Sequence, residues 1–368
     1  MSVETRVIKV DVNSSTSELL THDGINQAAR LLRRGEVVAF PTETVYGLGA
    51  NALDGGAVKK IFSAKNRPQD NPLIVHISRR EDLERLVSGR VPAPVRQLTA
   101  RFWPGPLTII LPRSDEVPEV TCGGLETVAI RMPSHPVARA LLTRAGLPVA
   151  APSANLSGLP SPTSAEHVLI DMEGRIPLIL DGGESPIGVE STVLDMTSSR
   201  PRLLRPGGVA TAQLREVLGN EVEIEREYRV ENEESVPRSP GMKYRHYAPR
   251  AELELLEGAS PRQLWEYAHN KEGYRALLLT DDTAEKLEDL PGVRIFDDPA
   301  DGIDRQFKLV IMGRASQPAD IAHNLFKFLR QLDEEGRNLI MVESIETAGL
   351  GEAIMNRLRK AASDVVEF

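Results

Sequence analysis

The sequence predicts a two-domain α/β protein, and three observations support this fold class. The chain has 368 residues, which is more than one hydrophobic core usually supports. Short apolar segments bounded by Pro, Gly or Asn alternate with segments of helical periodicity through the first two hundred residues. This alternation stops in a polar, charged stretch at 222–250 and resumes after it. We therefore expect one domain at 1–220, a linker at 221–250 and a smaller domain at 251–368.

The first domain is expected to be a twisted, mixed sheet covered by helices. Helices are expected at Ile25–Arg34 and at Pro136–Ala145, where Ser134-His135-Pro136 is a helix start signal. A hairpin is expected around Ser198–Arg200. The expected strands are Val37–Phe40, Leu73–Ile77, Leu107–Leu111, Thr127–Met132, Val149–Ala151, Leu178–Asp181 and Thr192–Asp195.

The second domain is expected to be a smaller, parallel, doubly wound sheet. A helix at Pro261–Asn270 has Ser260 as its expected N-cap, because a serine hydroxyl there can accept from the first backbone N–H groups. Helices at Ala319–Glu335 and Glu352–Ala362 complete the pattern, the former with a clear amphipathic face. The expected strands are Leu253–Leu256, Ala276–Thr280, Val293–Phe296, Leu309–Met312 and Leu339–Glu343.

Composition and charge exclude several classes of protein. The hydrophobic fraction of 41% and the charged fraction of 26% are typical of globular domains, and no apolar run is long enough to span a membrane. The single cysteine, Cys122, excludes an internal disulfide framework and a metal site built from cysteines. With no apolar leader at the N-terminus, a cytoplasmic location is expected. A net charge of −9 argues against a surface that binds nucleic acid everywhere, although a local basic cleft is compatible with it.

The first candidate site is the segment Pro41–Gly49, which follows an apolar strand where open α/β sheets place ligands. It combines two hydroxyls, a carboxylate and a phenol with glycines that let the backbone approach a ligand. A tight turn with caps explains the same residues equally well. Gly47-x-Gly49-x-x-Ala52 imitates a dinucleotide fingerprint, but six residues separate it from the strand, so a nicotinamide dehydrogenase is disfavoured.

Two further segments carry polar groups at strand ends. Lys65-x-Arg67 places two cations in a Pro-stiffened loop that could hold phosphate or carboxylate oxygens, although a solvated basic turn is the simpler interpretation. Ala151–Gly158, followed by Ser161, is dense in small hydrogen-bonding groups that suit a polyphosphate, or else it is a Ser/Pro loop before a capped helix. No phosphate loop, nucleophile elbow or zinc-binding motif occurs, so nucleophilic catalysis by a side chain has little support.

Eight short segments occur in a fixed order: Pro41–Leu48, Lys65-x-Arg67, Asn71–Leu73, Trp103–Thr108, Arg131–Pro133, Ala151–Asn155, Gly188–Thr192 and Leu204–Gly207. Together they closely resemble the YrdC-type domain of L-threonylcarbamoyladenylate synthases. Ser239–Pro249 resembles the linker of the longer, two-domain form, and Gly351–Arg357 resembles the end of its C-terminal Rossmann-like domain. One such segment is weakly specific, whereas eight in order over nearly the whole chain are strongly specific.

The resemblance implies a reaction of L-threonine, bicarbonate or CO2, and ATP that gives threonylcarbamoyl-adenylate and pyrophosphate. The product would serve a downstream complex that modifies the adenosine beside the anticodon of tRNA. Nucleotidyl transfer depends on positioning and charge neutralisation, which agrees with the absence of a nucleophile motif. Mg²⁺ is expected to accompany the phosphates, held largely by them and by water. The resemblance also leaves room for a weak contact with RNA.

The resemblance assigns roles to eleven residues. The residues implied to hold threonine are Thr42, His76, Arg131 and Ser191, and those implied to be catalytic are Lys65 and Arg67. The residues implied to bind ATP are Lys65, Arg67, Ser153, Asn155, Ser161, Arg205 and Tyr247. Tyr247 would reach over the nucleotide from a linker that acts as a flap, whose basic end follows an acidic run. From the sequence alone, His76 is more often a structural histidine than a ligand.

Two alternatives stay open at this level. A YrdC-type domain could act only as an RNA-binding module, in which case binding would fall steeply with salt and threonine would have no effect. A related domain also occurs in carbamoyl-transferring proteins of hydrogenase maturation, but those have additional acylphosphatase and zinc-finger segments that this chain lacks.

Overall fold

The computed structural model describes residues 3–219, 223–224, 246–289 and 306–368, which form two compact units. The first unit comprises Met1–Ser157 and Ser161–Tyr244, and the second comprises Gly158–Pro160 and Arg245–Phe368. The short segment at 158–160 therefore leaves the first unit and returns to it. Most of the expected linker and flap at 221–250 lies outside the described residues.

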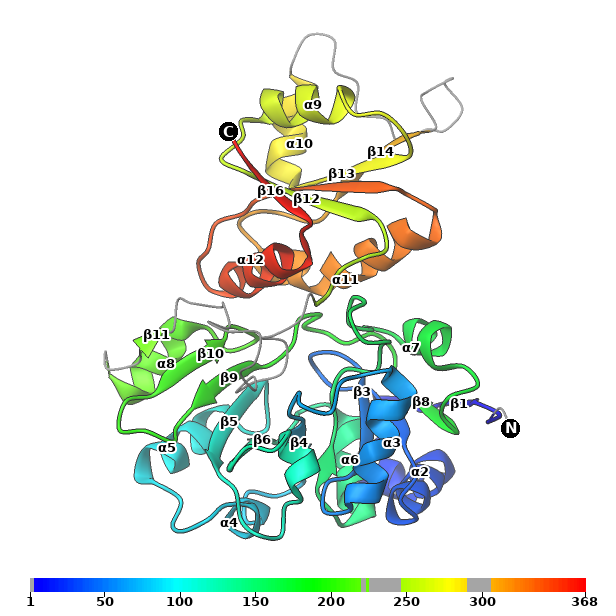
Figure 1. Ribbon diagram of the computed structural model, residues 1–368, viewed down its shortest axis with the longest axis vertical. Coiled ribbons are helices and arrows are strands. Elements are labelled where there is room, and N and C mark those ends of the chain that lie inside the picture. Colours follow the sequence, from blue (N-terminus) through cyan, green and yellow to red (C-terminus); the bar gives the residue numbers. More distant parts are fainter. Residues whose placement is uncertain (1–2, 220–222, 225–245, 290–305) are drawn as a thin grey trace. The chain divides into compact units, whose positions relative to one another are not determined.

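The first unit contains a mixed sheet with strand order β1-β8-β2-β3-β7-β4-β6-β5-β9-β10-β11 (Figure 1). Most of the expected strands are confirmed within one or two residues, and β9 and β10 form the expected hairpin. The strands are β1 Arg6–Lys9, β2 Val38–Phe40, β3 Gly47–Asn51, β4 Ile74–His76, β5 Leu107–Pro112, β6 Thr127–Arg131, β7 Val149–Ala150, β8 Leu178–Asp181, β9 Thr192–Asp195, β10 Arg202–Arg205 and β11 Glu223–Ile224.

Helices cover the two faces of this sheet in two layers. Because side chains alternate along a strand, Val38 and Phe40 face one layer while Val37 and Ala39 face the other. The first layer contains α1 Thr16–Thr21, α2 Asp23–Arg33 and α6 Pro136–Ala145. The other helices of the unit are α3 Gly55–Lys65, α4 Asp82–Leu86, α5 Ala93–Phe102, α7 Ala165–Met172 and α8 Thr211–Leu218, with a 3-10 turn at Glu119–Cys122.

The segment after β2 is not the simple loop that its sequence suggests. Gly47 begins β3, which pairs antiparallel with β2. A Cβ added to Gly49 would lie 2.7 Å from both Phe40 and Val149, so the strand needs glycine there because its neighbours fill the space. The expectation that these glycines do not form a strand-to-helix turn is therefore confirmed, and the hidden element is a strand.

The second unit is a parallel sheet with strand order β14-β13-β15-β12-β16, which confirms the expected doubly wound domain. Figure 1 shows α9 and α10 on one face and α11 and α12 on the other. The strands are β12 Glu252–Glu257, β13 Arg275–Leu279, β14 Phe307–Ile311, β15 Leu339–Glu343 and β16 Asp364–Glu367. The helices are α9 Pro261–His269, α10 Asp281–Glu288, α11 Pro318–Glu334 and α12 Leu350–Ala361.

Local signals explain where these elements begin. The Ser260 hydroxyl accepts from the Gln263 backbone N–H, and Pro261 occupies the first turn of α9, as expected. Several elements were not expected from the sequence, among them β1, β3, α10 and β16. The expected strand at Val293–Phe296 lies outside the described residues.

Candidate active site

Four polar side chains share one face of the first sheet. Strand register places His76 opposite Arg131, and Arg131 opposite Thr108, in one row across β4, β6 and β5. Ser191 precedes β9, which pairs with β5. Each of these residues lies two positions from a member of a small apolar cluster, so alternation sends them to the same face. That cluster is Ile74, Ile110, Ala129, Val193 and Leu204.

A buried ion pair joins this row to the loop after β2. Arg131 Nη2 lies 2.7 Å from Glu43 Oε1, and both side chains are almost inaccessible to solvent. Burial alone would raise the pKa of Glu43, but the charge and hydrogen bonding of Arg131 outweigh it and lower that pKa. Arg131 also donates from Nη1 to the Thr44 hydroxyl at 2.8 Å and from Nε to the Gly105 carbonyl. The guanidinium is therefore rigidly oriented.

His76 is a neutral histidine in this site. Burial, followed by the nearby charge of Arg131, lowers the pKa of His76 to about 3. Its Nδ1 lies 3.1 Å from the Ile74 carbonyl, which can only accept a hydrogen bond. The single proton of the neutral ring therefore resides on Nδ1, and Nε2 has a lone pair that can accept from an amine or a hydroxyl.

Thr42, also predicted to bind threonine, holds its own loop. Its hydroxyl donates to the Val45 carbonyl at 2.6 Å and accepts from the Val45 backbone N–H at 3.3 Å. It also lies 2.9 Å from the Thr44 hydroxyl, which connects it to Arg131. Thr42 therefore lies in the same region as Arg131, because Thr44 and Glu43 of its loop both contact Arg131. His76 lies opposite Arg131 on the neighbouring strand.

Ser191 and Arg205 meet at the other end of the row. The Ser191 hydroxyl lies 2.8 Å from that of Thr108, and Arg205 Nη2 donates to it at 3.2 Å. Arg205 also donates to the Ser191 carbonyl from both Nε and Nη2. The predicted threonine contact and the predicted ATP contact are thus direct neighbours.

Lys65 connects two of the candidate segments, Lys65-x-Arg67 and Ala151–Gly158. It is the last residue of α3 and is fully buried, and its ammonium donates to the backbone carbonyls of Ser153 and Asn155. The Ser153 hydroxyl in turn donates to the Asn155 side chain. One buried cation thus sets the backbone of the loop that follows β7.

Arg67 lies just beyond Lys65 because the chain turns sharply at the end of α3. Asn66 closes the helix in the left-handed region at φ 52°, which asparagine tolerates better than most residues. Arg67 Nη2 lies 3.3 Å from the Pro72 carbonyl, and the side chain is 9% exposed. The two predicted catalytic cations are therefore buried side chains rather than a solvated basic turn.

The remaining predicted ATP contacts lie in different units. The Ser161 hydroxyl donates to Glu190 Oε1 at 2.5 Å in the first unit. Tyr247 belongs to the second unit, where its ring stacks on Phe326 with centroids 5.5 Å apart and lies under the Arg357 guanidinium. The assignment of Tyr247 to ATP stays a prediction.

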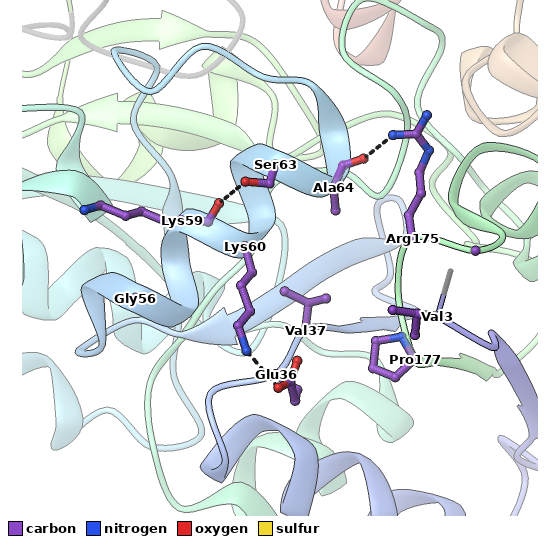
Figure 2. Close-up of a pocket in the computed structure, with 11 residues that line it drawn as sticks. Val3, Glu36, Val37, Gly56, Lys59, Lys60, Ser63, Ala64, Arg175 and Pro177 are labelled. Carbon is purple, nitrogen blue, oxygen red and sulfur yellow. Dashed lines mark hydrogen bonds and ion pairs between the residues drawn. The ribbon is translucent and has the colours of Figure 1, made fainter. Parts of the chain in front are cut away.

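An open cavity of about 720 Å³ elsewhere in the first unit contains none of the predicted site residues (Figure 2). Its wall includes Lys60, which pairs with Glu36 at 2.7 Å, and Arg175, which donates to the Ala64 carbonyl. Among the described residues, no group of three or more His, Cys, Asp or Glu side chains could hold a metal ion, and no helix could cross a membrane. The polar face of the sheet is therefore the candidate site.

Comparison with known proteins identifies the family. A family model described as "Telomere recombination" matches residues 30–207, and one described as "Threonylcarbamoyl-AMP synthase, C-terminal domain" matches residues 209–363. The chain is 50% identical to the threonylcarbamoyl-AMP synthase of Bacillus subtilis over 351 residues, which cover 94% of this chain and 95% of that protein. It is 47% identical to the threonylcarbamoyl-AMP synthase of Pyrococcus abyssi, over 92% of this chain and 94% of that protein.

The chain belongs to the threonylcarbamoyl-AMP synthase family. A crystal structure of P. abyssi Sua5 complexed with L-threonine is similar in fold, with a TM-score of 0.85 and 43% identity over 99% of both chains. The resemblance on which the sequence analysis relied is thereby confirmed, together with the α/β fold of both domains.

In this member of the threonylcarbamoyl-AMP synthase family, the sequence assigned no role to four residues that hold predicted site residues in place. They are Glu43, Thr44, Thr108 and Glu190, each of which contacts a predicted site residue. Thr108 could have been found from alternation, because it lies two residues before the apolar Ile110 on a strand that was expected. The partner of Arg131 could not be found in this way, because Glu43 follows a strand that is not adjacent to β6.

Proposed function

We propose that this protein makes L-threonylcarbamoyl-AMP from L-threonine, bicarbonate or CO2, and ATP, with release of pyrophosphate. The observation that carries the proposal is the row of His76, Arg131 and Thr108, with Ser191 beside it, on one sheet face. It occurs in a chain 43% identical to a protein that was crystallised with L-threonine. The enzyme would act as a nucleotidyltransferase, since it attaches an AMP group to the carbamate.

Threonine would bind over this row. Arg131 is held by Glu43, Thr44 and Gly105, and a guanidinium carries more N–H donors than these three acceptors use, so it would still pair with the threonine carboxylate. Nε2 of His76 would accept from the amine or the side-chain hydroxyl of threonine. Thr42 and Ser191 would complete the contacts.

The reaction would need no nucleophilic side chain. The neutral amine of threonine attacks the carbon of CO2, a C–N bond forms as one C–O π bond opens, and the proton lost by the amine passes to water, which gives the carbamate. A carbamate oxygen then attacks the α-phosphorus of ATP, and the bond to the pyrophosphate oxygen breaks. Lys65 and Arg67 would stabilise the charge that develops on the phosphoryl oxygens and on the leaving pyrophosphate.

ATP would bind to the loop that follows β7. Ser153, Asn155 and Ser161 supply donors and acceptors there, and Arg205 adds a buried cation beside Ser191. ATP would arrive as its Mg²⁺ complex, which fits a site without a protein metal cluster in the described residues. Tyr247 and the flap expected at 221–250 would close over the nucleotide.

The product would pass to a threonylcarbamoyl transferase that modifies tRNA, in the cytoplasm, with at most a weak direct contact to RNA. We also keep the domain boundaries at 1–220 and 251–368 as part of the proposal. An RNA-binding module without catalysis is not favoured, because it gives no role to the row of buried, oriented polar side chains.

The test is pyrophosphate release from ATP in bicarbonate buffer, with L-threonine, with L-serine or with no amino acid. We expect release that depends on L-threonine and is lower with L-serine, because serine lacks the methyl group and would bury less apolar surface in the site. Saturable ATP binding without threonine-dependent release would overturn the proposal. Salt-dependent RNA binding that ignores threonine would favour the binding module instead.

A further inference from the structure

The loop from Ser153 to Ser161 has its two ends in the first unit and its middle in the second. Its first half is held by Lys65, whose ammonium donates to Ser153 and whose carbonyl accepts from the Ser157 backbone N–H at 2.9 Å. Its far end is held by the hydrogen bond from Ser161 to Glu190. The conformation of the middle residues, 158–160, is set by different partners.

Arg330 of α11 is one partner of that middle segment. Its Nε and Nη2 both donate to the Pro160 carbonyl, at 3.1 Å and 2.6 Å. Arg330 is 5% exposed, and Pro160 is buried. Because proline has no N–H, the carbonyl is its only backbone hydrogen-bonding group, and a buried carbonyl requires a donor. A guanidinium satisfies this requirement with two parallel N–H groups.

A second contact fixes the other side of the same segment. The Ala248 backbone N–H donates to the Gly158 carbonyl at 2.9 Å. Gly158 has a φ of 95°, which glycine adopts without strain and other residues rarely adopt. Residues 158–160 are thus restrained at both ends within the second unit, directly before Ser161.

We propose that Arg330 is a positioning residue for ATP, acting through Pro160 on the loop that contains Asn155 and Ser161. This inference rests on the proposed function, because it takes that loop as the nucleotide site. By holding Pro160, the second unit would set the direction in which the chain enters Ser161. Arg330 would then contribute to the catalytic site without itself touching the substrate.

The physical reason is the cost of an alternative loop conformation. Burying a guanidinium is unfavourable unless acceptors replace the lost water, and the Pro160 carbonyl is an acceptor that supplies two hydrogen bonds. Without the guanidinium, the buried Pro160 carbonyl would lack these donors. Residues 158–160 would then move so that water could hydrogen-bond to it. Small displacements of binding groups reduce productive orientation steeply.

The experiment compares Arg330→Met with Arg275→Met in the full chain. Arg275 is a matched control, because it is 6% exposed in the same unit and donates to the Ala268 and Gly273 carbonyls there. We expect Arg330→Met to raise KM for ATP about tenfold and to change KM for threonine less than about twofold. Arg275→Met should change neither constant by more than about twofold, although it should lower Tm comparably.

Arg330→Lys provides the second variant if the methionine variant folds poorly. Lysine keeps one donor and the charge but lacks the planar fork, so KM for ATP should lie between those of the wild type and Arg330→Met. Equal increases in KM for ATP in the Arg330 and Arg275 variants would overturn the inference, because they would indicate general loss of stability. An unchanged KM for ATP in both Arg330 variants would overturn it as well.

Amide hydrogen exchange separates failure of this inference from failure of the proposed function. Exchange in a peptide spanning residues 153–161 should increase in Arg330→Met and not in Arg275→Met, with no substrate present. If the wild type shows no threonine-dependent pyrophosphate release, the proposed function fails, and this exchange pattern still decides whether Arg330 holds the loop. Unchanged exchange in Arg330→Met would show that it does not.

Discussion

The segments after β2 and at the end of β15 each carry a buried or half-buried glutamate, and the two carboxylates behave in opposite ways. Glu43, after β2 in the first unit, is 5% exposed and faces Arg131. Glu343, the last residue of β15 in the second unit, is more exposed and accepts from the Thr280 backbone and the Thr283 hydroxyl. Burial raises the pKa of Glu343, whereas Arg131 lowers the pKa of Glu43 despite its deeper burial.

The difference shows that a charged partner can reverse the effect of burial on the pKa of a carboxylate. Glu343 connects β15 to the first turn of α10, where Thr280 is the N-cap, and so serves the scaffold of its own unit. Glu43 keeps a cation oriented on the polar sheet face. An ionised pair is costly to bury, so the presence of the Glu43–Arg131 pair at the candidate site favours a role in substrate recognition.

The matched substitutions Glu43→Gln and Glu343→Gln should give the largest contrast. Loss of the Glu43 charge leaves the Arg131 cation buried without its carboxylate, which we expect to cost about 3–5 kcal/mol of unfolding free energy. Glutamine at 343 keeps an acceptor, and the threonine hydroxyls can rotate to pair with its amide, so the change should be within about 1 kcal/mol. Urea unfolding, with each transition fitted separately, measures both values. Equal costs would show that Arg131 does not depend on Glu43.

Lys65 and Lys59 allow a similar comparison, between a buried and an exposed cation of the same helix. Both belong to α3, but Lys65 is buried against the loop after β7, whereas Lys59 is exposed beside the open cavity in Figure 2. Lys65→Ala should lose roughly 2–4 kcal/mol of transition-state stabilisation, by analogy with oxyanion donors, and Arg67→Ala should behave similarly. Lys59→Ala removes an equal charge and should leave kcat/KM unchanged. Near-normal turnover in Lys65→Ala would remove its catalytic assignment.

The scaffold could be predicted from sequence more completely than the site. Strands such as Leu178–Asp181 are apolar runs between turn residues, so their bounds follow from local pattern. β3 was hidden because Gly47 and Gly49 are typical of turns, and the reason for Gly49 lies in its contacts with Phe40 and Val149. The family motifs identified residues that the structure brings together, including Lys65 with Ser153 and Ser191 with Arg205. The contact between Arg330 and Pro160 depends on tertiary packing, which no local pattern encodes.

Acidification should reduce stability gradually, through two histidines that stay neutral in the first unit. Burial lowers the pKa of His135 to about 4 and that of His76 to about 3. The unfolded chain binds protons on these rings near pH 6.5, and the folded chain does not until the pH is far lower. The unfolded state therefore gains protons first, so stability should fall as pH decreases from about 6.5 to 4, by up to about 1.4 kcal/mol per pH unit for each ring.

The variant His135→Asn isolates one of these contributions. His135 caps α6, since its Nδ1 accepts from the Val137 backbone N–H, and asparagine can make the same cap without titrating. The slope of unfolding free energy against pH should therefore decrease between pH 6.5 and 4, while stability at pH 8 changes little. Glu43 adds little to this slope above its ordinary pKa of 4.5; its contribution is lost as the pH falls below that value through the lowered pKa of the folded state, and it is the same in the wild type and in His135→Asn. An unchanged slope in His135→Asn would mean that this ring is protonated in the folded protein, and that the polar region around Glu43 is more hydrated than its burial indicates.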